Sequence, residues 1–205
     1  MKNILNILVI ALFLAGCTNT GKKLPVIGHP TITGNDTVYS TIKPFIFLSQ
    51  DSAVVTGKTF DNKIYVADFI FLSCTSICPI MTSEMKKVYE AFKTNPHIFF
   101  LSHTIDPDND TIPRLKAFAE ALRVDGHKWF FVTGEKDSIY SMAENSYFAT
   151  AYPDKSSPGN YIHSGGLLLV DTHKHIRGVY DGTNQKETER LIADLRILLN
   201  EQFPK

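Results

Sequence analysis

The feature that most constrains the fold is an apolar run that ends at a pair of cysteines. Residues 64–72 are almost all apolar or aromatic, as in a central strand buried on both faces of a sheet. The run stops just before Cys74, and Cys78 is followed by Pro79, which favours a helix start. Apolar residues then recur at helical spacing as far as residue 93. The sequence therefore predicts a buried strand, a short loop with two cysteines, and a helix.

The elements that follow predict an alternating α/β plan. Residues 97–104 form a second hydrophobic strand, and the helix between the two strands makes them parallel neighbours with a right-handed crossover. We expect helices at residues 113–122, 135–145 and 188–199, and strands at residues 129–132, 165–171 and 176–180. A long loop is expected at residues 147–160. This order is that of a thioredoxin-like α/β fold: a central mixed sheet flanked by helices, with an N-terminal β extension and an insertion before the strand that His163 leads.

The N-terminal segment has the pattern of an exported, lipid-anchored protein. A basic residue, an apolar run over residues 4–14 and a small-residue stretch lead to Cys17, and this pattern resembles a bacterial lipobox. The run is too short to span a bilayer as a mature helix. The resemblance implies that residues 1–16 are a lipoprotein signal peptide and that Cys17 carries the lipid. We expect a flexible linker at residues 17–35, a thioredoxin-like domain at residues 36–205, and a location in the cell envelope on the extracytoplasmic side of a membrane.

Composition excludes one class of partner and one use of the cysteines. The chain has 21 basic and 21 acidic residues, so it lacks the positive field of a nucleic-acid-binding protein. Its 205 residues, 43% of them hydrophobic, suffice for one domain with its own core. With Cys17 lipidated, two thiols remain, which are too few for a disulfide scaffold in an exported protein. Their spacing is therefore interpreted as chemistry.

Cys74 and Cys78 lie where the predicted strand passes into the helix, and that position favours thiolates. The amides and the dipole at a helix N-terminus stabilise negative charge, and the thiolate is the form of cysteine that binds metal or attacks a disulfide. The three residues between the cysteines leave room for both sulfurs to meet on one metal ion or to bond to each other. Spacing alone does not choose between a metal site, a redox dithiol and a structural disulfide.

The topology of the predicted fold selects a third residue for the site. The third core strand is antiparallel to the first, so its beginning lies beside the end of the strand that leads to the cysteines. His163 is at that beginning. His173 and His175 are at the far end of the same strand and belong to the opposite pole of the sheet. His103 and Asp106, near the end of the second parallel strand, are the next candidates after His163.

Two thiolates and one imidazole form a soft set of three ligands. Such a set suits Cu(I), accepts Cu(II) with an added weak ligand, and can hold zinc with one position open. Hard ions such as magnesium prefer oxygen ligands and are excluded. The donors therefore suit copper and leave zinc as an alternative.

Three ordered motifs resemble those of the Sco/SenC family. They are residues 69–81 around the cysteines, residues 105–111 with their Asp-Pro turn, and His163 at the head of a hydrophobic strand that ends at Asp171. The resemblance runs in register over about residues 64–199. Three motifs in the same order are far more specific than any one of them.

The resemblance implies a function and a set of ligands. It implies a thioredoxin-like copper chaperone that helps to assemble the binuclear copper centre of a haem-copper cytochrome oxidase, with Cys74, Cys78 and His163 as copper ligands. The partner is then the copper-bearing oxidase subunit or another copper protein, and the lipid anchor provides the membrane contact. Family members are also credited with reducing the cysteines of that subunit. The same two thiols leave an extracytoplasmic thiol–disulfide oxidoreductase as the alternative, and a copper sensor would bind metal equally well.

Parts of these motifs leave roles open. Asp106, in the turn motif of the family, either supports the metal site from behind or faces a partner protein, or it simply forms the turn at a helix entry. The first two roles are also open to His103. Between the cysteines the chain has Thr75-Ser76-Ile77, where many family members have a proline and an acid. This difference leaves the ligand pattern intact and bears on the stiffness and local charge of the loop.

Overall fold

A computed structural model describes residues 23–34, 36–153, 161–163 and 165–204. The predicted signal peptide and the predicted lipidation site at Cys17 lie outside this part of the chain. Within it, no helix is both long enough and apolar enough to cross a bilayer.

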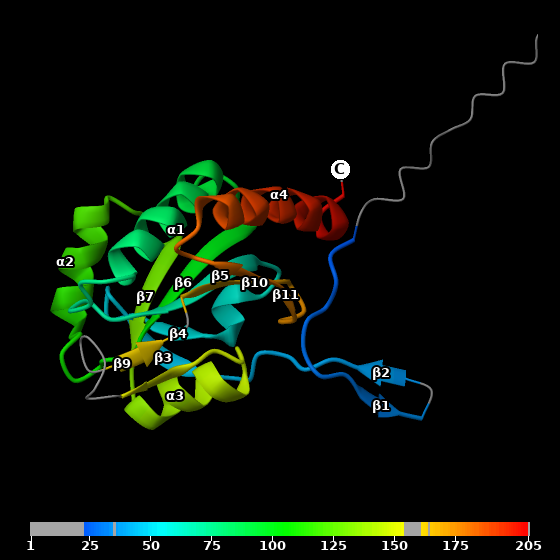
Figure 1. The fold of residues 1–205 in the computed structure, drawn as a ribbon, viewed down its shortest axis with the longest axis horizontal. Helices are drawn as coiled ribbons and strands as arrows, with labels where there is room; N and C mark the ends of the chain where they lie inside the picture. Colours follow the sequence, from blue (N-terminus) through cyan, green and yellow to red (C-terminus); the bar gives the residue numbers. More distant parts are fainter. Residues whose placement is uncertain (1–22, 35, 154–160, 164, 205) are drawn as a thin grey trace, which may run out of the picture.

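The main sheet is mixed, and within the described residues it has seven strands. In spatial order they are β11 (Ile176–Asp181), β10 (Gly166–Val170), β5 (Ile64–Ile70), β6 (Ile98–Thr104), β7 (Trp129–Thr133), β3 (Ile46–Ser49) and β4 (Val54–Thr56). Strands β5, β6 and β7 are parallel, and the other pairings are antiparallel. Every residue of β5 is buried, as the apolar run predicted. The carboxyl ends of β5 and β6 therefore meet at one edge of the sheet (Figure 1).

Helices cover both faces of this sheet (Figure 1). The helices of the described part are α1 (Cys78–Phe92), α2 (Ile112–Leu122), α3 (Lys136–Asn145) and α4 (Gln185–Gln202), with a short 3-10 turn at Gly57–Phe60. Alternate residues of β5 point to opposite faces, because side chains alternate along a strand. Val66 packs in the core under α1, α2 and α4, whereas Ala67 packs in the core under α3. The thioredoxin-like plan predicted from the sequence is confirmed.

Among the described residues, two short ribbons lie outside the main sheet. One joins β1 (Thr31–Thr33) to β2 (Asp36–Val38) and projects from the body of the domain (Figure 1). The other joins β8 (Ala151–Pro153) to β9 (Tyr161–His163), with Ala151 opposite His163.

The second ribbon corrects one expectation. We expected His163 to begin the core strand, but it lies in β9, and β10 begins only at Gly166. The backbone N–H of Gly182 donates to the carbonyl of Gly165 at 2.7 Å, just before β10. Glycine lowers the tendency to extend a strand, and a Cβ on Gly182 would come within 2.9 Å of the Gly165 oxygen. The core strand therefore begins only after Gly165, and His163 lies outside it.

The chain joins the domain earlier than we expected. We predicted a flexible linker over residues 17–35, but Leu24 is buried and Ile27 forms a β-bridge to the first residue of β11. The buried guanidinium of Arg177 donates to the carbonyls of Leu24 and Pro25 at 2.5 and 3.1 Å. Because a buried guanidinium needs acceptors, it fixes this backbone against the domain. Residues 24–27 therefore belong to the folded unit.

Candidate metal centre

The two cysteines lie where the strand-loop-helix prediction puts them. Cys74 is in the loop after β5, and Cys78 is the first residue of α1. They are 8% and 5% exposed, and the structure holds both as thiols. The backbone N–H of Cys78 donates to Cys74 Sγ at 3.4 Å, and Ser76 Oγ lies 3.5 Å from the same sulfur. The loop therefore folds the first sulfur back onto the start of α1.

These contacts make the two thiols unequal. Burial raises the pKa of Cys74, but hydrogen bonds from Cys78 and Ser76 outweigh burial, so the pKa is lowered overall. Burial raises the pKa of Cys78 far above its ordinary value, and the neighbouring Cys74 and the buried Asp68 add to this effect. Cys74 is therefore the thiol that ionises first.

Both cysteines line one cavity between α1 and α2. Its volume is about 410 Å³. Its wall consists of Ile70, Phe71, Leu72, Cys74, Cys78, Pro79, Thr82, Ser83, Lys86, Phe118 and Leu122. Although each cysteine is buried, a reactant that enters this cavity meets both.

The backbone after His163 passes beside the cysteine helix. A methyl group on Gly165 would lie 3.6 Å from Ile77 Cδ1 and 3.8 Å from Met81 Sδ, so the chain reaches the start of α1 two residues after His163. The side chain of His163 lies outside the described part. Among the side chains that are described, no three His, Cys, Asp or Glu residues are arranged to hold a metal ion. The role of His163 as a ligand therefore stays a prediction.

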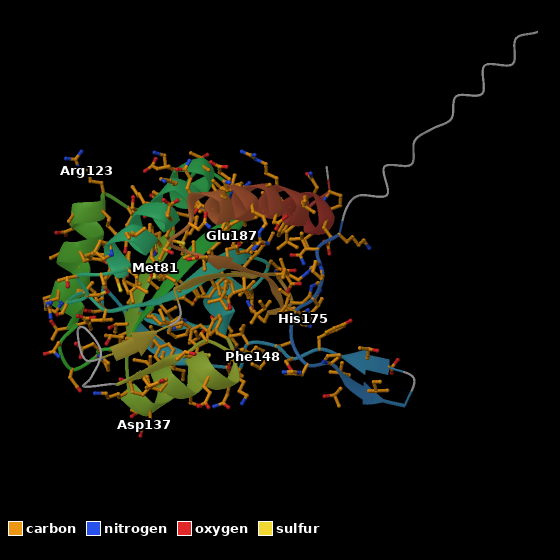
Figure 2. All side chains as sticks on the ribbon, in the orientation of Figure 1. Met81, Arg123, Asp137, Phe148, His175 and Glu187 are labelled. Carbon is orange, nitrogen blue, oxygen red and sulfur yellow. The ribbon has the colours of Figure 1, made fainter. Side chains whose placement is uncertain are left out.

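His173 and His175 lie at the opposite pole, as the topology predicted. The register pairs Val170, the last residue of β10, with Tyr65 near the start of β5. The turn that carries both histidines follows Val170 directly. Figure 2 shows His175 at this end of the domain, away from Met81 in the first turns of α1.

His103 is enclosed in the core. It is 0% exposed, and the rings of Phe45, Phe47, Phe69 and Tyr147 surround it with centroids 4.9 to 6.0 Å away. Burial lowers the pKa of His103 to about 3, so the imidazole is neutral. The prediction that it faces a partner is wrong, because its side chain points into the core under α3 and not to the edge of the sheet.

Asp106 is buried and fastens its own turn. Its two carboxylate oxygens accept from Asn109 Nδ2 at 3.0 and 2.9 Å, and its N–H donates to Thr104 Oγ1 at 3.0 Å. These bonds are those of a turn at a helix entry, which was one of the three roles we considered.

Sequence reasoning missed two buried acids near the cysteines. Asp110 accepts from the backbone N–H of Leu72, two residues before Cys74, at 3.0 Å. Asp68 is 1% exposed in the middle of β5, and within the described residues its carboxylate has no hydrogen bond. Burial raises the pKa of Asp68 to about 7. The side chain of Ser102, on the neighbouring strand, lowers this pKa by a smaller amount. The available signal was a lone acid inside an otherwise apolar run.

A buried cysteine pair at the strand-to-helix junction of such a sheet defines a thioredoxin-like dithiol protein. Comparison with known proteins identifies the family. The SCO1/SenC family model matches residues 34–200, so the chain belongs to the SCO1/SenC family. The resemblance drawn from the three motifs is thereby confirmed.

Solved structures agree with this assignment. A SCO1/SenC family lipoprotein from Bacillus anthracis str. Ames is 29% identical, with a TM-score of 0.71 over 78% of this chain and 95% of that one. BsSco, described as a member of the Sco family of cytochrome c oxidase assembly proteins with a disulfide switch, is 24% identical, with a TM-score of 0.73 over 90% and 100%. Bradyrhizobium japonicum ScoI, solved with copper bound, is 23% identical, with a TM-score of 0.64 over 78% and 100%. The last two structures are less than 25% identical to this chain, so their similarity supports the fold alone.

Proposed function

We propose that this protein is a copper-binding metallochaperone that delivers copper to the binuclear copper site of a haem-copper cytochrome oxidase, or matures that site. The observation that carries the proposal is the pair of thiols on one cavity, with Cys78 N–H on Cys74 Sγ, in a member of the SCO1/SenC family. The copper-bound ScoI and the oxidase assembly role given for BsSco support the choice of cargo and recipient.

The donors present suit copper as cargo. Two sulfurs of one short loop supply soft ligands, and each must lose its proton before it binds a metal. His163 is the proposed third ligand, because the backbone just after it runs against Ile77 at the start of α1. Two thiolates and one imidazole leave Cu(I) three-coordinate, which allows a recipient protein to add a ligand during transfer.

Thiol–disulfide exchange is the second candidate, and the unequal thiols favour it. The Cys74 thiolate attacks a partner disulfide, forms a mixed disulfide and releases one partner thiolate. Cys78 then loses its proton and attacks Cys74 Sγ, which releases the second partner sulfur. The partner gains two electrons, and this chain ends with a Cys74–Cys78 disulfide. The lowered pKa of Cys74 assigns it the first step.

The location is part of the proposal. Residues 1–16 act as a lipoprotein signal peptide, Cys17 carries the lipid, and the domain faces the extracytoplasmic side of a membrane. The Bacillus anthracis relative, which is described as a lipoprotein, supports this arrangement. The tether is shorter than we first expected, because residues 24–27 are fixed to the domain.

The experiment is an anaerobic titration of the full chain with Cu(I). We expect the reduced protein to bind one equivalent, and the protein oxidised to the Cys74–Cys78 disulfide to bind none, because a disulfide has no thiolate to donate. Elemental analysis after desalting measures both. Cys78→Ser serves as the control and should behave like the oxidised form. Equal retention of copper by the oxidised protein contradicts the proposal.

A further inference from the structure

The turn between β6 and α2 holds the cysteine loop through one buried carboxylate. Asp110 is 0% exposed, and its Oδ2 accepts from the N–H of Leu72 at 3.0 Å and from the hydroxyl of Thr104 at 2.6 Å. Thr104 is the last residue of β6, so the carboxylate joins the end of one parallel strand to the loop that leaves the next.

Leu72 lies where the sheet no longer supplies acceptors. The last backbone bond between the two strands joins Ile105 N–H to Ile70 carbonyl at 2.9 Å. Beyond it the Leu72 N–H points to Asp110, and the Cys74 N–H closes a turn onto the Phe71 carbonyl at 3.2 Å. A carboxylate acceptor makes a stronger hydrogen bond than a neutral one. The carboxylate therefore fixes the loop inside that turn, at its second residue.

Arg114 extends the same contact to the next residue of the loop. Its Nη1 lies 3.6 Å from Asp110 Oδ1, and its Nη2 donates to Ser73 Oγ at 3.5 Å. Its guanidinium also donates to the carbonyl of Asn109 at 2.9 Å. One half-exposed side chain thus connects the buried carboxylate to the residue that precedes Cys74.

We infer that Asp110 is the positioning residue of the dithiol: by fixing Leu72, with the help of Arg114, it sets how often the two sulfurs lie within reach of each other. The inference rests on the proposed function, because it concerns the same two thiols. A fixed loop raises the effective concentration of one sulfur at the other, which favours both chelation of a metal and closure of the disulfide. A loosened loop loses both advantages together.

The test measures two constants in four variants of the full chain in detergent. Cys17→Ser is the common background, so that only the loop thiols exchange. The first is the equilibrium constant for formation of the Cys74–Cys78 disulfide by exchange with oxidised glutathione, and it needs no metal. The second is the affinity for Cu(I) in competition with a chelator. For Asp110→Ala we expect both constants to fall by about five- to tenfold, because the anchor at Leu72 is lost.

The matched control is Thr104→Val. It removes the hydroxyl that donates to this carboxylate and accepts from the Asp106 N–H, but it keeps the contact of the carboxylate with Leu72. Both constants should therefore stay within about twofold of the wild type even if the melting temperature falls. Asp110→Asn retains an oxygen acceptor and should restore most of the loss. The half-exposed Arg114→Gln should fold and should shift both constants in the same direction by about two- to threefold.

Three results overturn the inference. They are constants in Asp110→Ala that match those of the wild type, equal losses in Asp110→Ala and Thr104→Val, and, should Asp110→Ala not fold, unchanged constants in Arg114→Gln. Failure of the proposed function appears separately. A wild type that does not bind Cu(I) ends the chaperone proposal, whereas the glutathione equilibrium still reports on the loop.

Discussion

Replacing Asp68 with asparagine is expected to stabilise the protein at pH 8 and to change its stability little at pH 4. The carboxyl is fully buried in β5, and burial raises its pKa from 3.8 to about 7. The folded state therefore holds this proton more tightly than the unfolded state does. The stability contributed by the group is complete below the unfolded pKa and is lost as the pH rises through the folded pKa.

The size of the effect follows from the two pKa values. A shift of this size corresponds to about 3 to 4 kcal/mol between pH 4 and pH 8. Asparagine has the same shape and does not ionise, so the stability difference between variant and wild type should grow by that amount over this range. Urea denaturation at both pH values measures it. Asp36→Asn, in the exposed strand β2, is the control and should differ by less than about 0.5 kcal/mol at both. A difference for Asp68→Asn that does not change with pH contradicts the prediction.

Replacing Arg177 with alanine is expected to lower the free energy of unfolding by about 3 to 5 kcal/mol. The guanidinium is 5% exposed and donates to Asp171 at 3.0 Å and to Glu201 at 2.8 Å. It also holds the carbonyls of Leu24 and Pro25. Its loss leaves a buried carboxylate uncompensated and releases the N-terminal segment. Urea denaturation measures the first effect, and limited proteolysis near residue 24 measures the second.

Arg190→Ala is the matched control for this prediction. Arg190 also pairs with two acids, Glu187 and Asp194, but its side chain is 46% exposed. An exposed ion pair contributes at most about 1 kcal/mol, because water solvates both charges when the pair is broken. Equal losses of stability in the two arginine variants would contradict the predicted effect of burial. An unchanged proteolysis pattern in Arg177→Ala would show that the N-terminal segment is not fixed through Arg177.

The sequence was sufficient to predict the core of the fold because local pattern and tertiary environment agree there. The apolar run at residues 64–72 corresponds to β5, Ile64–Ile70. Helix α1 begins at Cys78, and the proline that follows in its first turn favours a helix start. A strand buried on both faces can be recognised from its continuous apolar run alone, without knowing which strands pair with it. The position of the cysteines at the edge of the sheet follows from the same pattern.

Other parts depend on contacts that no periodicity records. His163 was predicted at the head of the core strand, yet it lies in the separate β8–β9 ribbon, and β10 begins only at Gly166. The fixed segment at Leu24 depends on Arg177, which is distant in sequence. Asp106 and Asp110 share one turn motif, and only the folded structure shows that the second acid reaches the cysteine loop.

We propose that Cys74, Cys78 and His163 together hold one copper ion. X-ray absorption at the copper edge, on the Cu(I)-loaded wild type and on His163→Ala, tests it most directly. We expect two sulfur ligands and one nitrogen ligand in the wild type, and the same two sulfurs without that nitrogen in the variant. Identical copper environments in both proteins would contradict the claim, because they would exclude His163 from the site.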